Sequence, residues 1–122
     1  MNKKRKERIE CHKKLCEWSK LVRQRDGNQC QICGRKDFII SHHIIPKELK
    51  QFALDLNNGV ALCRKCHKYN FSISPHRNAL AFCFWLQKVK PSQYDYLKSF
   101  LEPITKPEEA KLGGDEIRTK DL

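Results

Sequence analysis

The chain has 122 residues, of which 25 are Lys or Arg, 14 are Asp or Glu and 7 are Cys, giving a formal net charge of +11. This length fits one domain, and its 39% of hydrophobic residues predicts a small core that needs a further brace such as a metal ion. There is no run of about 18 apolar residues, which excludes a transmembrane helix and a membrane partner. The charged N-terminus also lacks the apolar stretch of a secretory signal. We therefore expect a cytoplasmic, intracellular protein whose cysteines bind metal or act as thiols instead of forming disulfides.

The positive charge is concentrated before residue 102. Residues 1–25 hold 10 basic and 3 acidic side chains, residues 26–101 hold 11 and 5, and residues 102–122 hold 4 and 6. A polyanion is therefore the first partner to consider. The last segment has two prolines, a Gly-Gly pair and few apolar residues, which predicts a disordered tail without chemistry.

A helix is predicted over residues 6–25, since no Gly or Pro interrupts them and apolar residues recur at three- and four-residue steps. These apolar residues are Leu15, Trp18, Leu21 and Val22. Asp26-Gly27-Asn28 is typical of a helix end.

Two short strands are predicted next. The β-branched and aromatic run Phe38-Ile39-Ile40 leads into His42-His43, and Pro46 closes this first strand. Residues 47–56 fit either a short helical turn or a loop, and a turn over 55–59 precedes a second strand at 60–62.

Three helical segments follow the strands. A helix is expected to start within residues 64–69. Ser74-Pro75 is typical of an N-cap followed by proline, which predicts an apolar helix over residues 76–89. Pro91-Ser92 breaks that helix, and residues 93–101 form a plausible last one.

Four of the seven cysteines predict a zinc site. Cys30-x-x-Cys33 and Cys63-x-x-Cys66 each have the spacing that lets a tight turn direct two thiolates at one tetrahedral ion. With four thiolates the ion would be structural, because a catalytic zinc needs an open position. The other three cysteines lack partner spacing and are interpreted as packing or surface thiols.

Polar residues with metal and proton chemistry lie between and beside the cysteine pairs. His42 and His43 are neighbours in a strand, so they point to opposite faces, and one can bind metal while the other faces the substrate. His67 follows the last zinc cysteine and is held close to the strand that carries the pair. Asn58 sits in a turn, where its amide can satisfy backbone groups.

These motifs together resemble the HNH endonuclease family, in the branch that carries four zinc cysteines. The resemblance covers roughly residues 18–70, including His42-His43-Ile44 and Asn58-Gly59-Val60-Ala61-Leu62-Cys63. It implies a ββα-metal fold in which His42 and His67 ligate a catalytic divalent metal. It also implies that His43 is the general base and that Asn58 fixes the loop that orients it.

The third ligand of the catalytic metal departs from the family pattern. Many relatives carry another His or Asn about one helical turn after the last motif histidine, and Asn70 is the candidate here. His12 and His76 lie outside the pattern and are interpreted as exposed helix residues. The ion could be Mn²⁺, Ni²⁺, Co²⁺ or Zn²⁺, which suit imidazole, or Mg²⁺ with oxygens from DNA.

Basic residues predict contact with the DNA backbone, most simply of double-stranded DNA, with modest sequence specificity. They fall on the first helix and around the proposed metal site, although a charge run is also the ordinary solvated face of a helix. The candidates are Lys3, Lys4, Arg5, Lys6, Lys13, Lys14, Arg23, Arg35, Lys36, Lys47, Arg64, Lys65 and Lys68.

The sequence as a whole predicts an α+β protein with a treble-clef-like ββα-metal core stapled by a four-cysteine zinc site. We expect a basic N-terminal helix over 1–17, a nuclease core over 18–70, a helical packing segment over 71–101 and the tail over 102–122. The expected function is metal-dependent DNA endonuclease activity, in a family used in restriction, intron homing and phage DNA packaging. The alternatives are a non-catalytic zinc-stabilised nucleic-acid-binding module and a thiol-redox or metal-carrying protein, which would leave the basic charge unexplained.

Overall fold

The computed structural model describes residues 2–105 of the 122-residue chain. Its elements are helix α1 (Lys3–Arg25), strands β1 (Ile39–His43) and β2 (Gly59–Cys63), and helices α2 (Ala79–Val89) and α3 (Pro91–Thr105). Short helical turns η1 (Lys50–Phe52) and η2 (Leu56–Asn58) precede β2, and η3 (Lys65–Tyr69) follows it. The α+β class and the two predicted strands are thereby confirmed.

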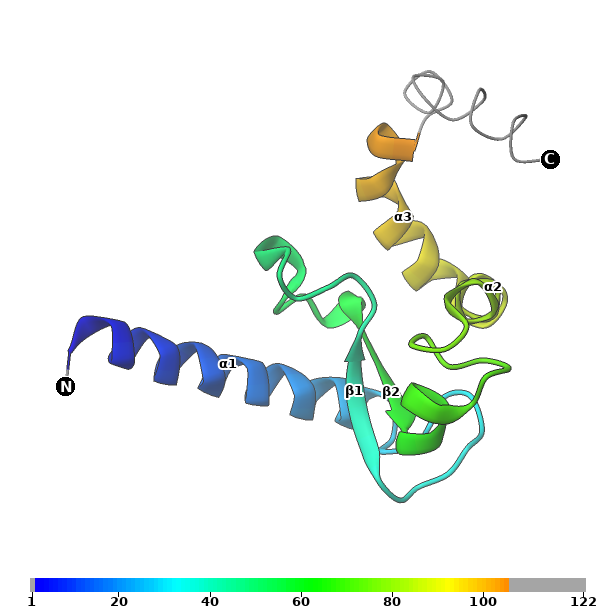
Figure 1. Ribbon diagram of the computed structural model, residues 1–122, viewed down its shortest axis with the longest axis horizontal. Coiled ribbons are helices and arrows are strands. Elements are labelled where there is room, and N and C mark those ends of the chain that lie inside the picture. The colour runs from blue at the N-terminus through cyan, green and yellow to red at the C-terminus, as the bar shows by residue number, and fades with distance from the viewer. Residues whose placement is uncertain (1, 106–122) are drawn as a thin grey trace.

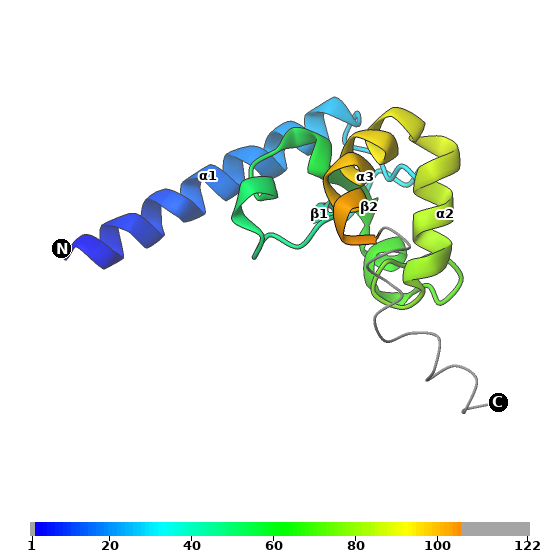
Figure 2. The same cartoon turned by 90° about the horizontal axis from the view of Figure 1, so that it is seen from above.

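Helix α1 is a long helix of which only the C-terminal part packs on the body (Figure 1). Trp18 and Val22 are its buried residues, whereas residues 3–14 are all exposed. Figure 2 shows the first turns extending away from the rest of the fold. Asp26 caps the helix, and Gly27 follows with φ of +71°, a value that favours glycine, so the predicted helix end is confirmed.

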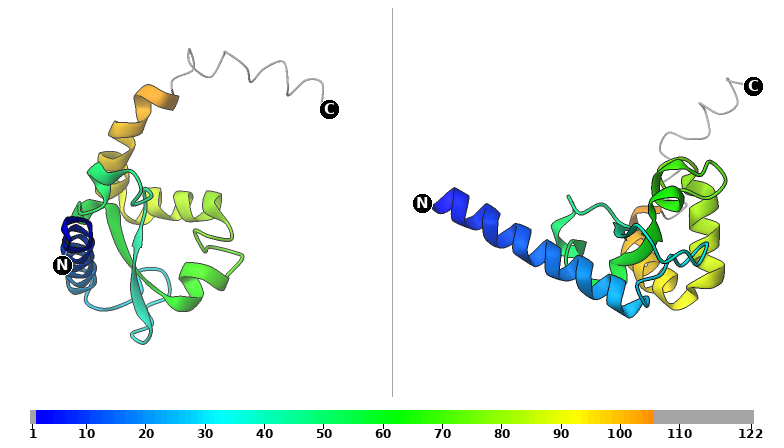
Figure 3. Two further views of the ribbon diagram at one scale, coloured as in Figure 1. Left: turned by 60° about the vertical axis from the view of Figure 1, so that its left-hand side comes forward. Right: turned by 90° about the horizontal axis from the view of Figure 1, so that it is seen from below.

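The two strands form an antiparallel hairpin that lies between α1 and α2 (Figure 3, left). The register pairs His42 with Val60 and His43 with Gly59. On one side, Val60 and Leu62 belong to a buried cluster with Phe82 of α2. On the other side, a Cβ on Gly59 would come within 2.5 Å of Val22 and 2.6 Å of Trp18, so only glycine permits α1 to approach this closely.

The interval between the strands consists of short turns. Residues 47–56, which fitted a turn or a loop, contain η1 and lead into η2. Phe52 is buried there with Ile45 and with Leu97 of α3. These three side chains form a second small cluster that ties α3 to the loop after β1.

The helix predicted over residues 76–89 begins later than expected. Asn78 caps α2, its side-chain oxygen accepting a hydrogen bond from the Ala81 N–H at 3.1 Å. The prediction that Ser74 is the N-cap is therefore wrong. Ser74 is fully buried and holds a loop instead, because its hydroxyl bonds to the backbone of two histidines.

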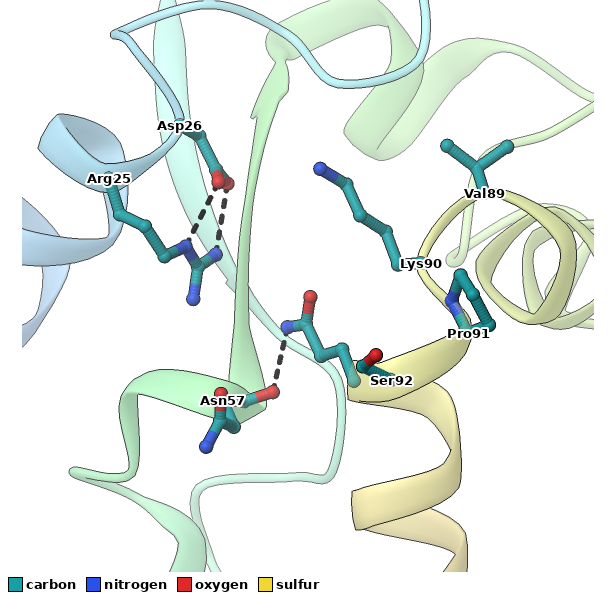
Figure 4. Close-up of a pocket in the computed structure, with 8 residues that line it drawn as sticks. Arg25, Asp26, Asn57, Val89, Lys90, Pro91 and Ser92 are labelled. Atoms are coloured by element: carbon teal, nitrogen blue, oxygen red, sulfur yellow. Dashed lines mark hydrogen bonds and ion pairs between the residues drawn. The ribbon is translucent and has the colours of Figure 1, made fainter.

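Helix α3 starts at Pro91, two residues earlier than predicted. Its N-terminus and the C-terminus of α1 flank a cleft of about 450 Å³ (Figure 4). Arg25 pairs there with Asp26 at 3.0 Å and donates to the carbonyl of Gly59 at 2.7 Å. Gln93 donates to the same carbonyl at 2.7 Å, so this junction joins both helices to the start of β2.

The predicted tail over 102–122 lies largely outside the described residues, because the description ends at Thr105. Within the part of the chain that the structure describes, no helix has the length and apolar character needed to cross a membrane.

Candidate metal centres and active-site cleft

The four predicted zinc cysteines come together at the base of the hairpin. Their sulfur atoms all lie within 4.8 Å of one another, with 3.5 Å between the sulfurs of Cys33 and Cys63. Zn–S bonds of about 2.3 Å place tetrahedral sulfurs about 3.8 Å apart, so the cluster fits a zinc ion. The turns also match this use, since the Cys33 N–H donates to the Cys30 sulfur and the Cys66 N–H to the Cys63 sulfur.

The electrostatics of Cys30 favour the thiolate that a zinc ligand must be. Burial acts to raise the pKa of this thiol, but backbone N–H groups of Cys33, Cys63 and Ile32 outweigh it and lower the pKa to about 7. Cys66 shows the opposite balance, because burial and the neighbouring Cys63 raise its pKa. A zinc ion would stabilise both as thiolates.

A second cluster holds three histidines. The Nε2 atom of His67 lies between the other two rings. It is 3.1 Å from Nδ1 of His42 and 3.0 Å from Nε2 of His76. His42 comes from β1, His67 from η3 and His76 from the loop before α2. His42 and His67 are partly buried and His76 is exposed, so the cluster opens at one side.

Burial sets the charge state of two of these imidazoles. It lowers the pKa of His42 to about 3, with the neighbouring His67 and His76 contributing. It likewise lowers the pKa of His67 to about 4, helped by His76 and Lys68. Both rings are therefore neutral at physiological pH, which is the form that ligates a metal.

Hydrogen bonds alone do not satisfy this cluster. The single Nε2 atom of His67 faces two nitrogen neighbours, and it can donate to only one of them. Among the residues that the structure describes, its buried Nδ1 atom has no hydrogen-bond partner, and a metal on Nε2 would leave the hydrogen on that atom. Three converging imidazole nitrogens with Zn–N distances of about 2.0–2.1 Å would stand about 3.3 Å apart, so the donor set fits a transition-metal ion.

Ser74 explains how His76 reaches the cluster. Its hydroxyl donates to the carbonyl of His67 at 2.6 Å and accepts from the N–H of His76 at 3.2 Å. The prediction that His76 lies on a helix outside the pattern is wrong. Asn70, the sequence candidate for a third ligand, instead accepts a hydrogen bond from the N–H of Ser72 at 2.9 Å.

His43 points to the opposite face of β1 from His42, as the strand alternation predicts. Its ring stacks on Trp18 with centroids 3.8 Å apart and an interplanar angle of 9°. Its Nε2 lies 2.9 Å from the carbonyl oxygen of Ala53. Because a carbonyl only accepts, Nε2 carries the hydrogen, and Nδ1 is the basic nitrogen of the neutral ring.

Asn58 is fully buried and braces the segment that follows His43. Its side-chain oxygen accepts from the N–H of Ile45 at 2.6 Å, and its amide donates to the carbonyls of Ile45 at 2.8 Å and Phe52 at 3.1 Å. Phe52 immediately precedes Ala53, the partner of His43. The Asn58 side chain thus holds the loop between β1 and β2 at two points, Ile45 and Phe52.

One cleft of about 940 Å³ unites these histidines. His42, His43, His67 and His76 all contribute to its lining. Of the predicted DNA-binding residues, Lys47 and Lys68 line this cleft, and Lys98 of α3 joins them without having been predicted.

The other predicted basic residues lie elsewhere. Lys3, Lys4, Arg5, Lys6, Lys13 and Lys14 are exposed on the free part of α1. Arg35, Lys36, Arg64 and Lys65 are exposed near the zinc cysteines in sequence, whereas Arg23 is partly buried and donates to Ser19.

The comparison with protein families matches residues 30–70 to the model described as HNH endonuclease. This segment, 41 of the 122 residues, matches the HNH endonuclease family. It contains both strands, η3 and all four zinc cysteines, which agrees with the ββα-metal fold that the motifs implied. Comparison of the whole chain with curated proteins and with solved structures gives no match. The HNH match ends at Asn70, before the loop that carries His76.

Proposed function

We propose that this protein is a metal-dependent endonuclease that hydrolyses phosphodiester bonds in DNA. The observation that carries the proposal is the convergence of three imidazole nitrogens from residues that line one cleft. The HNH family match supports a nuclease or another nucleic-acid-related function.

His42, His67 and His76 would hold the catalytic divalent ion. An all-imidazole donor set suits Mn²⁺, Ni²⁺, Co²⁺ or Zn²⁺ better than Mg²⁺, which prefers oxygen ligands. When bound, such an ion supplies positive charge for the phosphate oxygens and the leaving 3′ oxygen. The partial exposure of the cluster leaves room for the phosphate to approach.

His43 would act as the general base that deprotonates the attacking water. Its hydrogen bond to the Ala53 carbonyl keeps the hydrogen on Nε2, so Nδ1 can accept the proton. As the ring becomes positively charged, that carbonyl also stabilises the charge. Asn58 would act through the loop as a positioning residue, since an amide does not titrate in this range.

Basic side chains would hold the DNA backbone. Lys47 and Lys68 stand at the cleft, and the exposed lysines of α1 extend the positive surface beyond it. Contacts of this kind position the duplex without reading its sequence.

Cleavage of supercoiled plasmid tests the proposal. The zinc-loaded chain is incubated with Mn²⁺, Ni²⁺ or Mg²⁺, and nicked and linear products are separated on a gel. We expect cleavage that depends on the added ion and that falls at least about 100-fold in His43→Ala. His12→Ala, which removes a histidine remote from the cleft, serves as the matched control and should cut normally.

Two results would contradict the proposal. Cleavage by His43→Ala at the parental rate would overturn the role of the base. Binding to DNA without cleavage with any of the three ions would instead favour a non-catalytic binding module.

A further inference from the structure

The active-site cleft has an apolar character that a phosphate backbone alone does not require. Away from the histidines, its walls come from β1, α2, α3 and the loop after β1. The larger apolar or aromatic residues that line that part include Ile44, Phe82, Leu86, Tyr94, Leu97 and Leu101. A volume of about 940 Å³ is at the upper end of ordinary small-ligand pockets.

Helix α2 presents one continuous stripe to this cleft. Ala79, Phe82, Cys83 and Leu86 line it at helical spacing, whereas Leu80 and Phe84 do not. Helix α2 thus contributes one of its faces to the wall of the cleft.

The rim of the cleft is basic. Lys47, Lys68 and Lys98 line it from three different segments, with Glu48 as the acidic side chain among them. The ammonium group of Lys98 also lies 6.0 Å from the centre of the Tyr94 ring. Positive charge beside apolar and aromatic walls matches the chemistry of a nucleotide, which joins an anionic phosphate to a flat base.

We propose that this cleft receives a single nucleobase turned out of the DNA duplex next to the phosphate that is cut. The inference rests on the proposed nuclease function and specifies its preferred substrate as DNA that already holds an unpaired nucleotide. In this arrangement the lysines bind the flanking phosphates, the base packs against the apolar walls, and the histidines face the backbone. Because turning out a paired base is costly, a nucleotide that is already extrahelical would bind best.

Binding of matched oligonucleotides tests this directly. Three fluorescent duplexes of one length are compared with the zinc-loaded full chain and no added catalytic ion: fully paired, with one extrahelical thymidine, and with one extrahelical abasic nucleotide. We expect the extrahelical thymidine to bind at least about tenfold more tightly than the paired duplex. The abasic duplex has the same looped backbone without a base, so it should lose this advantage.

Two tryptophan variants of α2 show whether the cleft is responsible. Cys83→Trp fills the cleft from an exposed position, and Leu80→Trp places the same ring at a position that is 67% exposed and outside the cleft lining. Unchanged zinc content and thermal melting confirm that both variants fold. The preference for the extrahelical base should disappear in Cys83→Trp and persist in Leu80→Trp.

Equal binding of the paired and extrahelical duplexes would overturn the inference and leave the nuclease function standing. The same holds if the abasic duplex binds as tightly as the thymidine duplex, or if Cys83→Trp keeps the preference. No binding to any of the three duplexes would overturn the proposed function together with the inference.

Discussion

Trp18 lies flat against His43, with ring centroids 3.8 Å apart and planes inclined by 9°. The indole is 3% exposed and donates its N–H to the carbonyl of Asp55 at 2.8 Å, so it is held on both its face and its edge. It therefore fixes the plane of the imidazole, while the Ala53 carbonyl fixes the rotation of the ring within that plane.

Replacing Trp18 with Phe removes the hydrogen bond to the Asp55 carbonyl and reduces the ring area that stacks on His43. We expect cleavage to fall by about 10- to 100-fold, because a misplaced base loses its alignment with the water. Plasmid cleavage at saturating DNA measures the effect, with zinc content as the check on folding. Trp85→Phe in α2 is the control, and equal rates for the two variants would show that the stack does not position His43.

Asn58 is predicted to contribute to stability as well as to positioning. Asn58→Ala leaves the buried N–H and carbonyl of Ile45 without their side-chain partner, which costs about 3 kcal/mol. The Phe52 carbonyl loses one of its two hydrogen bonds and keeps the one from the Asp55 N–H. Asn57→Ala, one residue earlier at an exposed position, should change the free energy of unfolding by less than about 0.5 kcal/mol. Urea unfolding measures both, and comparable losses would contradict the bracing role.

His76 and Asn70 compete for the role of third metal ligand, and the two predictions differ. His76→Ala removes one of three converging nitrogens, so the affinity for Co²⁺ or Ni²⁺ should fall at least about tenfold. Asn70→Ala should leave that affinity nearly unchanged. Titration followed by the absorption spectrum of Co²⁺ distinguishes them, and the reverse order of affinities would restore Asn70 as the ligand.

Two exposed cysteines test the zinc site, because Cys33 belongs to the four-sulfur cluster and Cys83 does not. Cys33→Ser removes a member of the four-sulfur cluster, so we expect loss of bound zinc and a melting temperature lowered by more than about 10 °C. Cys83→Ser, outside that cluster, should retain one zinc per chain. Elemental analysis of protein purified without chelator gives the answer, and full zinc in both variants would exclude Cys33 as a ligand.

If the exposed lysines of α1 bind phosphates, the affinity for DNA depends on the salt concentration through them. Deleting residues 2–14 should reduce the slope of log affinity against log salt by about 0.9 for each phosphate contact that is lost. The body of the protein should keep its melting temperature, because these residues are exposed throughout. A slope that stays the same would show that this part of α1 does not touch phosphate.

The sequence predicted those parts of the fold that short-range chemistry determines. Cys30-x-x-Cys33 and Cys63-x-x-Cys66 indicated one metal site, and strand alternation placed His42 and His43 on opposite faces. Ser74-Pro75 misled, because the same residues that cap a helix also hold a buried turn, and only the tertiary contact with His67 decides between these roles. The sequence did not indicate His76 as a possible metal ligand, because the loop held by Ser74 brings it to His67 and no helical spacing relates the two residues. The Trp18 and His43 stack joins distant segments, so no local pattern indicated it.

The continuity of α1 has a mechanical consequence. The 15 residues from Lys3 to Glu17 form one continuous helical segment that ends next to Trp18, which touches His43. At a rise of about 1.5 Å per residue this segment spans about 22 Å, roughly two thirds of a turn of B-DNA. Under the proposed function, the helix would set the distance between the cut and the farthest phosphate contact. Inserting a single residue would rotate every lysine beyond it by about 100° around the axis, which changes where that contact falls without altering the charge of the helix.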